Sequence, residues 1–141
     1  MAHRYHLTVR STDIDVIGHV NNAKYLEYME WARFEWIWEQ GFTLDELRRR
    51  AIMPVVANIN INYRKELKMR EEVTAITTVV KVGEKSFVIR QELYNAADVL
   101  VADADVTMVM IDANTRQSIS LPVELKETLL VELETVNQST E

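Results

Sequence analysis

Alternating apolar and polar residues predict five β-strands along this chain. We expect the strands at residues 5–12, 55–64, 73–82, 86–94 and 99–112. Residues 83–85 place a glycine between two of these strands, which is typical of a hairpin turn. Strands that follow one another through tight turns run antiparallel, so the pattern predicts an antiparallel sheet.

A helical pattern from about residue 22 to residue 40 separates the first strand from the others. Its apolar residues fall within an arc of about 140°, with charged residues opposite, so we expect one face of this helix in the core. The apolar face consists of Tyr25, Leu26, Met29, Ala32, Trp36 and Ile37.

Two shorter helices complete the pattern. Thr43 followed by Glu46 resembles a capping box, which predicts a helix to about residue 51, and Pro54 is expected to end that segment. Pro122 predicts the start of a last helix that ends near residue 133, and residues 134–141 have the composition of a frayed tail. An antiparallel sheet that covers one long helix gives the class α+β, in a single domain over residues 1–141.

Two surfaces carry residues that an ordinary solvated face would not. Trp31, Phe34 and Trp38 lie among the charges of the long helix. Asparagines at positions 58, 60 and 62 share one face of the second strand, although asparagine is poor in strands. The asparagines indicate either hydrogen bonding at an interface or site, or a plain solvent-facing surface. We expect self-association to bury both faces.

The composition excludes several classes of protein. The 141 residues contain no cysteine, which excludes disulfides, thiolate nucleophiles and cysteine-bound metals. A net charge of −6 without a basic patch argues against binding to nucleic acid. No stretch reaches the ~18 apolar residues of a membrane span, so we expect a cytoplasmic protein without a membrane partner.

Common cofactor and nucleophile motifs are also absent from the sequence. Its three glycines form neither a phosphate-binding loop nor a dinucleotide fingerprint, and no serine lies in a Gly-x-Ser-x-Gly elbow. We interpret His3 and His6 as a surface pair near the N-terminus, not as a metal site. The sequence therefore predicts chemistry without a metal or an organic cofactor.

Asp13, Asp15 and His19 remain as chemical candidates, just before the start of the long helix. A carboxylate with a pKa of about 3.9 is ionised at pH 7, so it can act as nucleophile or as general base toward water. An amide N–H at a helix N-terminus can polarise a carbonyl group. A thioester fits best, because a thiolate leaves more readily than an amine or alcohol. From spacing alone, the alternative stays open that an aspartate caps a turn and His19 is an ordinary loop residue.

These residues belong to a longer motif, which reads DxDxxGHVNNAxYxxYxExAR from Asp13 to Arg33. It resembles the signature of the 4-hydroxybenzoyl-CoA thioesterase-like branch of the hotdog-fold acyl-CoA thioesterases. The likeness continues through residues 55–64 and 101–104. This part of the sequence is most similar to the long-chain acyl-CoA thioesterases associated with fatty-acid degradation.

The resemblance implies a hotdog fold, in which an antiparallel sheet wraps around one long central helix. It implies Asp15 as the catalytic carboxylate, the backbone amide of Asn22 as the group that polarises the thioester, and His19 as the accompanying imidazole. Two protomers of this family usually join their sheets edge to edge, with the active sites at the interface, so a homodimer or homotetramer is expected. We expect substrate contacts from Gly18, Tyr25, Asn58, Asn60 and Arg64.

One segment departs from the family pattern. Many relatives have a proline and a Gly-Asp pair after the second strand, whereas residues 65–71 of this chain read KELKMRE. The sequence therefore does not determine which residues of that loop contact CoA.

The expected activity is hydrolysis of medium- to long-chain acyl-CoA to fatty acid and CoA. A hotdog hydratase or dehydratase that uses Asp15 and His19 on an enoyl thioester is one alternative. A non-catalytic module that binds acyl-CoA is the other.

Overall fold

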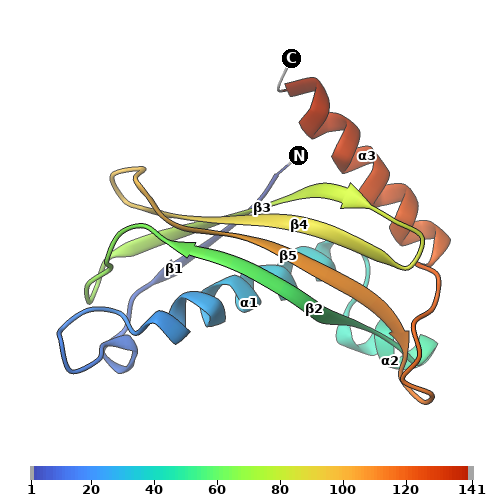
Figure 1. The fold of residues 1–141 in the computed structure, drawn as a ribbon, viewed down its shortest axis with the longest axis horizontal. Helices are drawn as coiled ribbons and strands as arrows, with labels where there is room; N and C mark the ends of the chain where they lie inside the picture. Colours follow the sequence, from blue (N-terminus) through green and yellow to red (C-terminus); the bar gives the residue numbers. More distant parts are fainter. Residues whose placement is uncertain (1, 140–141) are drawn as a thin grey trace.

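The computed structural model of the protein describes residues 2–139. A five-stranded antiparallel sheet curves around the long helix α1, and two further helices lie at one end of the sheet (Figure 1). The strands are β1 (His3–Thr8), β2 (Ile52–Tyr63), β3 (Glu72–Val82), β4 (Ser86–Asn95) and β5 (Leu100–Asp112). The helices are the short 3-10 turn η1 (Ser11–Asp13), α1 (Asn22–Glu39), α2 (Leu44–Arg50) and α3 (Val123–Ser139). This arrangement confirms the predicted α+β class.

The strands lie in the order β1-β3-β4-β5-β2, and each pair is antiparallel. β1 pairs only with the first half of β3, from His3 opposite Thr77 to Thr8 opposite Glu72. β2 forms the other edge and pairs with β5. Within the described residues, the second backbone edge of β2 faces no strand, which leaves a row of polar groups open to another chain.

Two strand boundaries differ from the prediction by three residues or more. β1 ends at Thr8, because residues 11–13 form η1, where Asp13 accepts a hydrogen bond from the backbone of Arg10 at 3.0 Å. β2 begins before Pro54, which lies opposite Met110 inside the strand. An edge strand tolerates proline, since one side of its backbone needs no donor. The predicted start of this strand at residue 55 was therefore wrong.

The last helix is longer than its composition indicated. α3 continues to Ser139, past the end that the sequence predicted near residue 133. The frayed tail predicted for residues 134–141 stays a prediction, and residues 140–141 lie outside the described residues. Leu125 and Leu129 of α3 are fully buried. Glu132 accepts hydrogen bonds from Gln40 Nε2 at 2.8 Å and Trp36 Nε1 at 3.3 Å, which ties α3 to the C-terminal end of α1. None of the described helices has a stretch long and apolar enough to cross a membrane.

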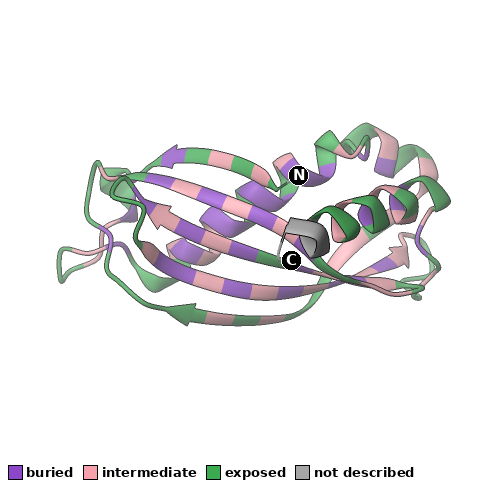
Figure 2. Ribbon diagram, turned by 90° about the horizontal axis from the view of Figure 1, so that it is seen from above, coloured by how far each residue is buried: buried purple, intermediate pink, exposed green. Residues whose placement is uncertain are grey.

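Burial alternates along the strands as the sequence pattern predicts (Figure 2). α1 fills the concave side of the sheet with Tyr25, Tyr28, Met29, Ala32, Arg33, Trp36 and Ile37. Its opposite face leaves Trp31, Phe34 and Trp38 between 37% and 46% exposed. The predicted core face of α1 is therefore confirmed, apart from Leu26, which is only half-buried.

One polar cluster lies inside this core. Arg33 Nη1 donates to Gln91 Oε1 at 3.0 Å, and Gln91 Nε2 donates to the Met29 carbonyl at 2.9 Å and to Thr77 Oγ1 at 3.2 Å. Burial lowers the pKa of Arg33. The cluster fixes the middle of α1 against β3 and β4, so the start of α1 has a rigid support.

Candidate active site

The loop between η1 and α1 is a small closed hairpin. Ile14 and Val20 form an antiparallel bridge, the Asp15 N–H donates to the His19 carbonyl at 2.9 Å, and the Gly18 N–H donates to the Asp15 carbonyl at 3.1 Å. Gly18 has φ +86°, a left-handed conformation that glycine adopts without strain. Gly18 therefore shapes the turn that holds Asp15 and His19 side by side.

The helix that follows begins with unsatisfied backbone donors. The Asn21 side chain caps α1 by accepting from the Ala23 N–H at 2.9 Å. The backbone N–H of Asn22 has no acceptor among the described residues. A free N–H at this end of an 18-residue helix favours a negatively charged or polarised oxygen nearby.

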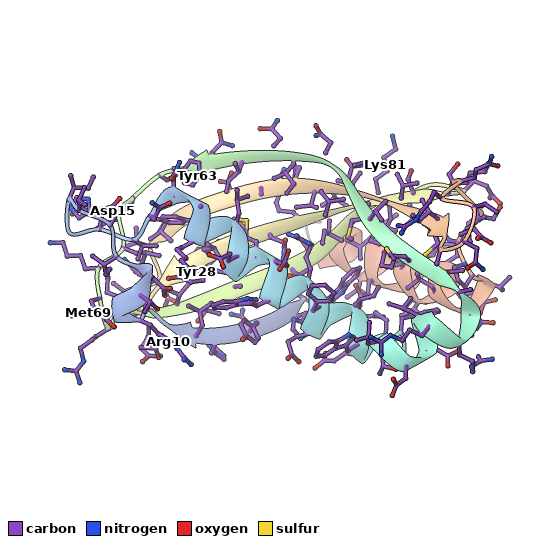
Figure 3. The ribbon with its side chains drawn as sticks, turned by 90° about the horizontal axis from the view of Figure 1, so that it is seen from below. Arg10, Asp15, Tyr28, Tyr63, Met69 and Lys81 are labelled. Atoms are coloured by element: carbon purple, nitrogen blue, oxygen red, sulfur yellow. The ribbon has the colours of Figure 1, made fainter. Side chains whose placement is uncertain are left out.

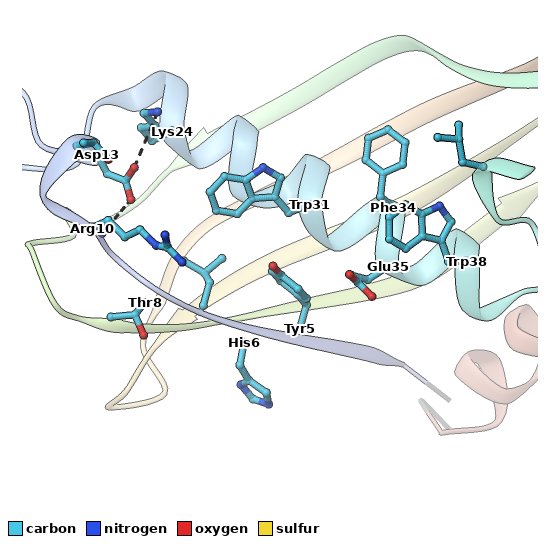
Figure 4. A pocket seen from close by; sticks show the side chains of 13 residues that line it. Tyr5, His6, Thr8, Arg10, Asp13, Lys24, Trp31, Phe34, Glu35 and Trp38 are labelled. Atoms are coloured by element: carbon cyan, nitrogen blue, oxygen red, sulfur yellow. Dashed lines mark hydrogen bonds and ion pairs between the residues drawn. The ribbon is translucent and has the colours of Figure 1, made fainter.

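Asp13 lies on the closed side of this loop. It is 4% exposed, and its Oδ2 accepts from the Tyr28 hydroxyl at 2.6 Å and from the Arg10 N–H at 3.0 Å. Lys24 Nζ lies 3.9 Å from Oδ1, as the dashed line in Figure 4 marks. Burial and the hydrogen bond to Asp13 both raise the pKa of Tyr28. These contacts engage the Asp13 carboxylate and give it a structural role.

Asp15 lies on the open side of the same loop. Its side chain is half-exposed, and its Oδ1 accepts from the Ile17 N–H at 3.0 Å. Figure 3 places Asp15 at one end of the molecule, the end at which Tyr63 and Met69 also lie. An open hollow of about 520 Å³ starts at Asp15. It is lined by Asp15, Ile17, His19, Val20, Asn22, Tyr25, Tyr63, Arg64, Lys65 and Glu66.

The far wall of this hollow is the segment that follows β2. The Tyr25 hydroxyl donates to the Lys65 carbonyl at 3.0 Å, and the Tyr63 hydroxyl donates to the Asn22 carbonyl at 3.2 Å. The rings of Tyr25 and Tyr63 meet edge to face, with centroids 5.3 Å apart. Burial raises the pKa of Tyr25. Through these hydroxyl groups, both tyrosines link the start of α1 to the end of β2.

The structure brings five of the predicted site residues to one hollow: Asp15, His19, Asn22, Tyr25 and Arg64. Gly18 shapes the adjoining turn and is not part of the lining. Asn58 and Asn60 do not join them, because they are exposed on β2 and lie outside this hollow. Their role in binding substrate stays a prediction that depends on a second copy of the chain.

Arg64 reaches the hollow with its charge already engaged. Its Nε donates to Asp103 Oδ2, and Asn62 Nδ2 donates to Asp103 Oδ1 at 3.1 Å. The hydrogen bond from Arg64 lowers the pKa of Asp103. A contact between Arg64 and a CoA phosphate therefore has to compete with this ion pair.

Glu66 is a site residue that the sequence reasoning missed. Its Oε2 lies 2.8 Å from His19 Nε2. The only signal was the departure from the family pattern at residues 65–71, which did not reveal which side chain would face His19.

A larger groove of about 1010 Å³ runs between β1 and the outer face of α1 (Figure 4). Trp31, Phe34 and Trp38 lie along it, and Asp13 lies at its end. The candidate groups Asp15, His19 and Asn22 do not line this groove, whose carboxylates are Asp13 and Glu35. The reactive groups gather at the smaller hollow.

No group of three or more His, Cys, Asp or Glu side chains within residues 2–139 is placed to hold a metal ion. His6 Nδ1 instead lies 3.0 Å from Thr74 Oγ1, and His3 Nε2 lies 3.5 Å from Glu39. The hollow itself offers the Asp15 carboxylate, the His19 imidazole and the amide at the start of α1. The carboxylate can attack a carbonyl group or activate water toward it, while the amide N–H holds the carbonyl oxygen.

Comparison with known proteins identifies the family. The model of the Thioesterase-like superfamily matches residues 9–129. The chain belongs to this superfamily. Its sequence is 36% identical to the long-chain acyl-CoA thioesterase FadM of Escherichia coli strain K12 over 124 residues, which cover 87% of this chain and 93% of FadM. These findings confirm the predicted relationship to thioester hydrolases.

Solved structures share the same fold. The probable thioesterase YbaW of Escherichia coli is 32% identical, with a TM-score of 0.75 and coverage of 92% of this chain and 98% of YbaW. SAV2348 of Staphylococcus aureus, solved in complex with CoA, has a TM-score of 0.91 at 19% identity and covers 95% of this chain and 85% of that chain. At that identity the likeness to SAV2348 concerns the fold alone. The hotdog fold predicted from the sequence is confirmed.

Proposed function

We propose that this thioesterase hydrolyses medium- to long-chain acyl-CoA to a free fatty acid and CoA. The observation that carries the proposal is the hollow that Asp15, His19 and Asn22 line together, beside an Asn22 N–H that has no acceptor among the described residues. The preference for an aliphatic chain rests on the 36% identity to a long-chain acyl-CoA thioesterase.

In the proposed reaction, the thioester carbonyl oxygen accepts from the Asn22 N–H at the start of α1. This contact stabilises the negative charge that develops on the oxygen during attack. The Asp15 carboxylate acts as nucleophile or as base toward water, and CoA leaves as a thiolate. No metal or organic cofactor is needed for these steps.

Thiol release from a panel of acyl-CoA substrates tests the proposal. We expect kcat/KM to rise from acetyl-CoA to medium- and long-chain acyl-CoA, because a longer chain buries more apolar surface. Stoichiometric binding of every acyl-CoA without thiol release would contradict the hydrolase and favour the acyl-CoA-binding module. A preference for short chains would contradict the proposed substrate class.

The proposed enzyme works as a homodimer or homotetramer, in line with the open edge of β2 and the exposed aromatic face of α1. Trp31, Phe34 and Trp38 are more exposed than large aromatic residues of a monomer usually are. Sedimentation at micromolar concentration should show a species larger than the 16.4 kDa chain. A single species of the monomer's mass would contradict self-association. The cytoplasmic location stays a prediction.

A further inference from the structure

The contact between His19 and Glu66 joins two segments that are far apart in the sequence. His19 Nε2 and Glu66 Oε2 lie 2.8 Å apart, at the rim of the hollow that also contains Asp15. Both side chains are partly exposed, at 36% and 47%. Lys68 Nζ is the other charged group near this carboxylate, 3.9 Å from Oε1. The shorter contact to His19 is therefore the dominant partner of Glu66.

The backbone on both sides of Glu66 is fixed. The Lys65 carbonyl accepts from the Tyr25 hydroxyl at 3.0 Å, and the Leu67 carbonyl accepts from the Val20 N–H at 2.8 Å. The Leu67 side chain is fully buried. Glu66 thus reaches His19 from a segment that is anchored to the same loop and helix as the site, so the contact is held in place before substrate binds.

The contact decides which nitrogen of His19 carries the proton. A carboxylate only accepts hydrogen bonds, so Nε2 must be the N–H that faces Glu66. In the neutral ring, Nδ1 is then left with a free lone pair as the proton acceptor. A carboxylate on the far side of the ring also stabilises the imidazolium that forms when Nδ1 takes a proton.

We infer that Glu66 is a positioning residue that holds His19 as the general base for water, while Asp15 acts as nucleophile. This inference rests on the proposed hydrolase function. First, a bond forms between an Asp15 oxygen and the acyl carbon, the carbon–sulfur bond breaks, and the electron pair leaves with CoA thiolate. Then water oxygen bonds to the acyl carbon, one proton of water moves to His19 Nδ1, and the bond to the Asp15 oxygen breaks. The proton on His19 is finally released to solvent.

Rapid measurement of CoA release separates the two steps. In Glu66→Ala, the first step should continue while the second slows, so a burst of CoA stoichiometric with active sites should precede a slow steady state. We expect kcat to fall on the order of 10-fold, less than the ~10²-fold expected for His19→Ala, which removes the base itself. Glu66→Gln keeps an acceptor for the Nε2–H and should lose less activity than Glu66→Ala.

A double-mutant cycle tests whether Glu66 acts through His19. Glu66→Ala should have no further effect on kcat in a His19→Ala background. Glu71→Ala is the matched control, because Glu71 is a carboxylate of the same segment that accepts from the Lys68 N–H at 2.6 Å and makes no ion pair with His19. It should produce no burst.

The inference would be overturned by a Glu66→Ala effect that persists in full without His19. An equal loss in the first and later turnovers, as expected for a residue that only anchors the loop, would also overturn it. Glu66 variants that match the wild type would overturn it as well, while the hydrolase function stands. A wild-type protein that releases no CoA from any acyl-CoA would instead overturn the proposed function.

Discussion

Asp13 and Asp15 lie two residues apart in one loop, yet they have opposite surroundings. Asp13 is buried and accepts from the Tyr28 hydroxyl and the Arg10 N–H, with Lys24 close by. Asp15 is half-exposed at the hollow, and within the described residues its side chain accepts one hydrogen bond, from the Ile17 N–H. A carboxylate with its acceptor sites filled stabilises a fold, whereas one with a free oxygen can react with a substrate.

The comparison also shows how the two sides depend on each other. The Asn21 N–H donates to the Asp13 carbonyl at 2.9 Å, so the residue that caps α1 is held by the closed side. The same loop presents Asp15 and His19 on the open side. Substitutions on the closed side should therefore lower the free energy of unfolding, and substitutions on the open side should lower turnover.

Asp13→Ala should cause the largest loss of stability. It leaves the buried Tyr28 hydroxyl and the Arg10 N–H without their acceptor, and each unsatisfied group costs about 1–3 kcal/mol. We expect the free energy of unfolding to fall by about 3 kcal/mol, measured by urea denaturation. Asp15→Ala is the matched control and should change it by less than about 1 kcal/mol, since its site is half-exposed. Equal losses would remove the distinction between the two carboxylates.

Tyr28→Phe should cost less, because it removes one hydrogen bond to Asp13 and keeps the ring in the core. A hydrogen bond to a charged group contributes about 1.5–3 kcal/mol, and we expect a loss near the lower end because the hydrogen bond from the Arg10 N–H and the ion pair with Lys24 remain. Tyr63→Phe removes an exposed hydroxyl that donates to the Asn22 carbonyl, and it should have a smaller effect on thermal unfolding. The reverse order would mean that Asp13 is not held by Tyr28.

Asn21→Ala tests the boundary between the two sides and should cost less stability than Asp13→Ala or Tyr28→Phe. Loss of an N-cap side chain costs about 1 kcal/mol, and Asn21→Ser should recover most of it because serine also caps well. If the cap also aligns the Asn22 N–H, kcat should fall in Asn21→Ala and recover in Asn21→Ser. An unchanged kcat with lower stability would limit Asn21 to a structural role.

The sequence was sufficient for most of the fold. Alternation along β3, β4 and β5 and the apolar stripe of α1 predicted the elements that the core requires, since burial depends directly on that periodicity. The start of β2 and the end of α3 were missed. An edge strand can hold Pro54, and Glu132 is bonded to Trp36 and Gln40, which lie far from it in the sequence.

The residues of the candidate site were predicted only where they lie in the stretches that resemble the family, residues 13–33 and 55–64. Asp15, His19 and Asn22 belong to one loop and helix start, so a motif reveals them. Glu66 comes from a segment whose position depends on Tyr25, Val20 and the burial of Leu67. The filled acceptors of Asp13 likewise need the packed helix, so the choice between the two aspartates from sequence rested on resemblance.

The central claim is that Asp15 is the reacting carboxylate, and the turnover of Asp15→Asn tests it most directly. The substitution keeps size and shape and removes the charge, so thiol release should fall by at least ~10²-fold. Substrate affinity should change much less, because most contacts to CoA and the acyl chain remain. A folded Asp15→Asn protein with near wild-type thiol release, beside an inactive but folded Asp13→Asn protein, would contradict the account.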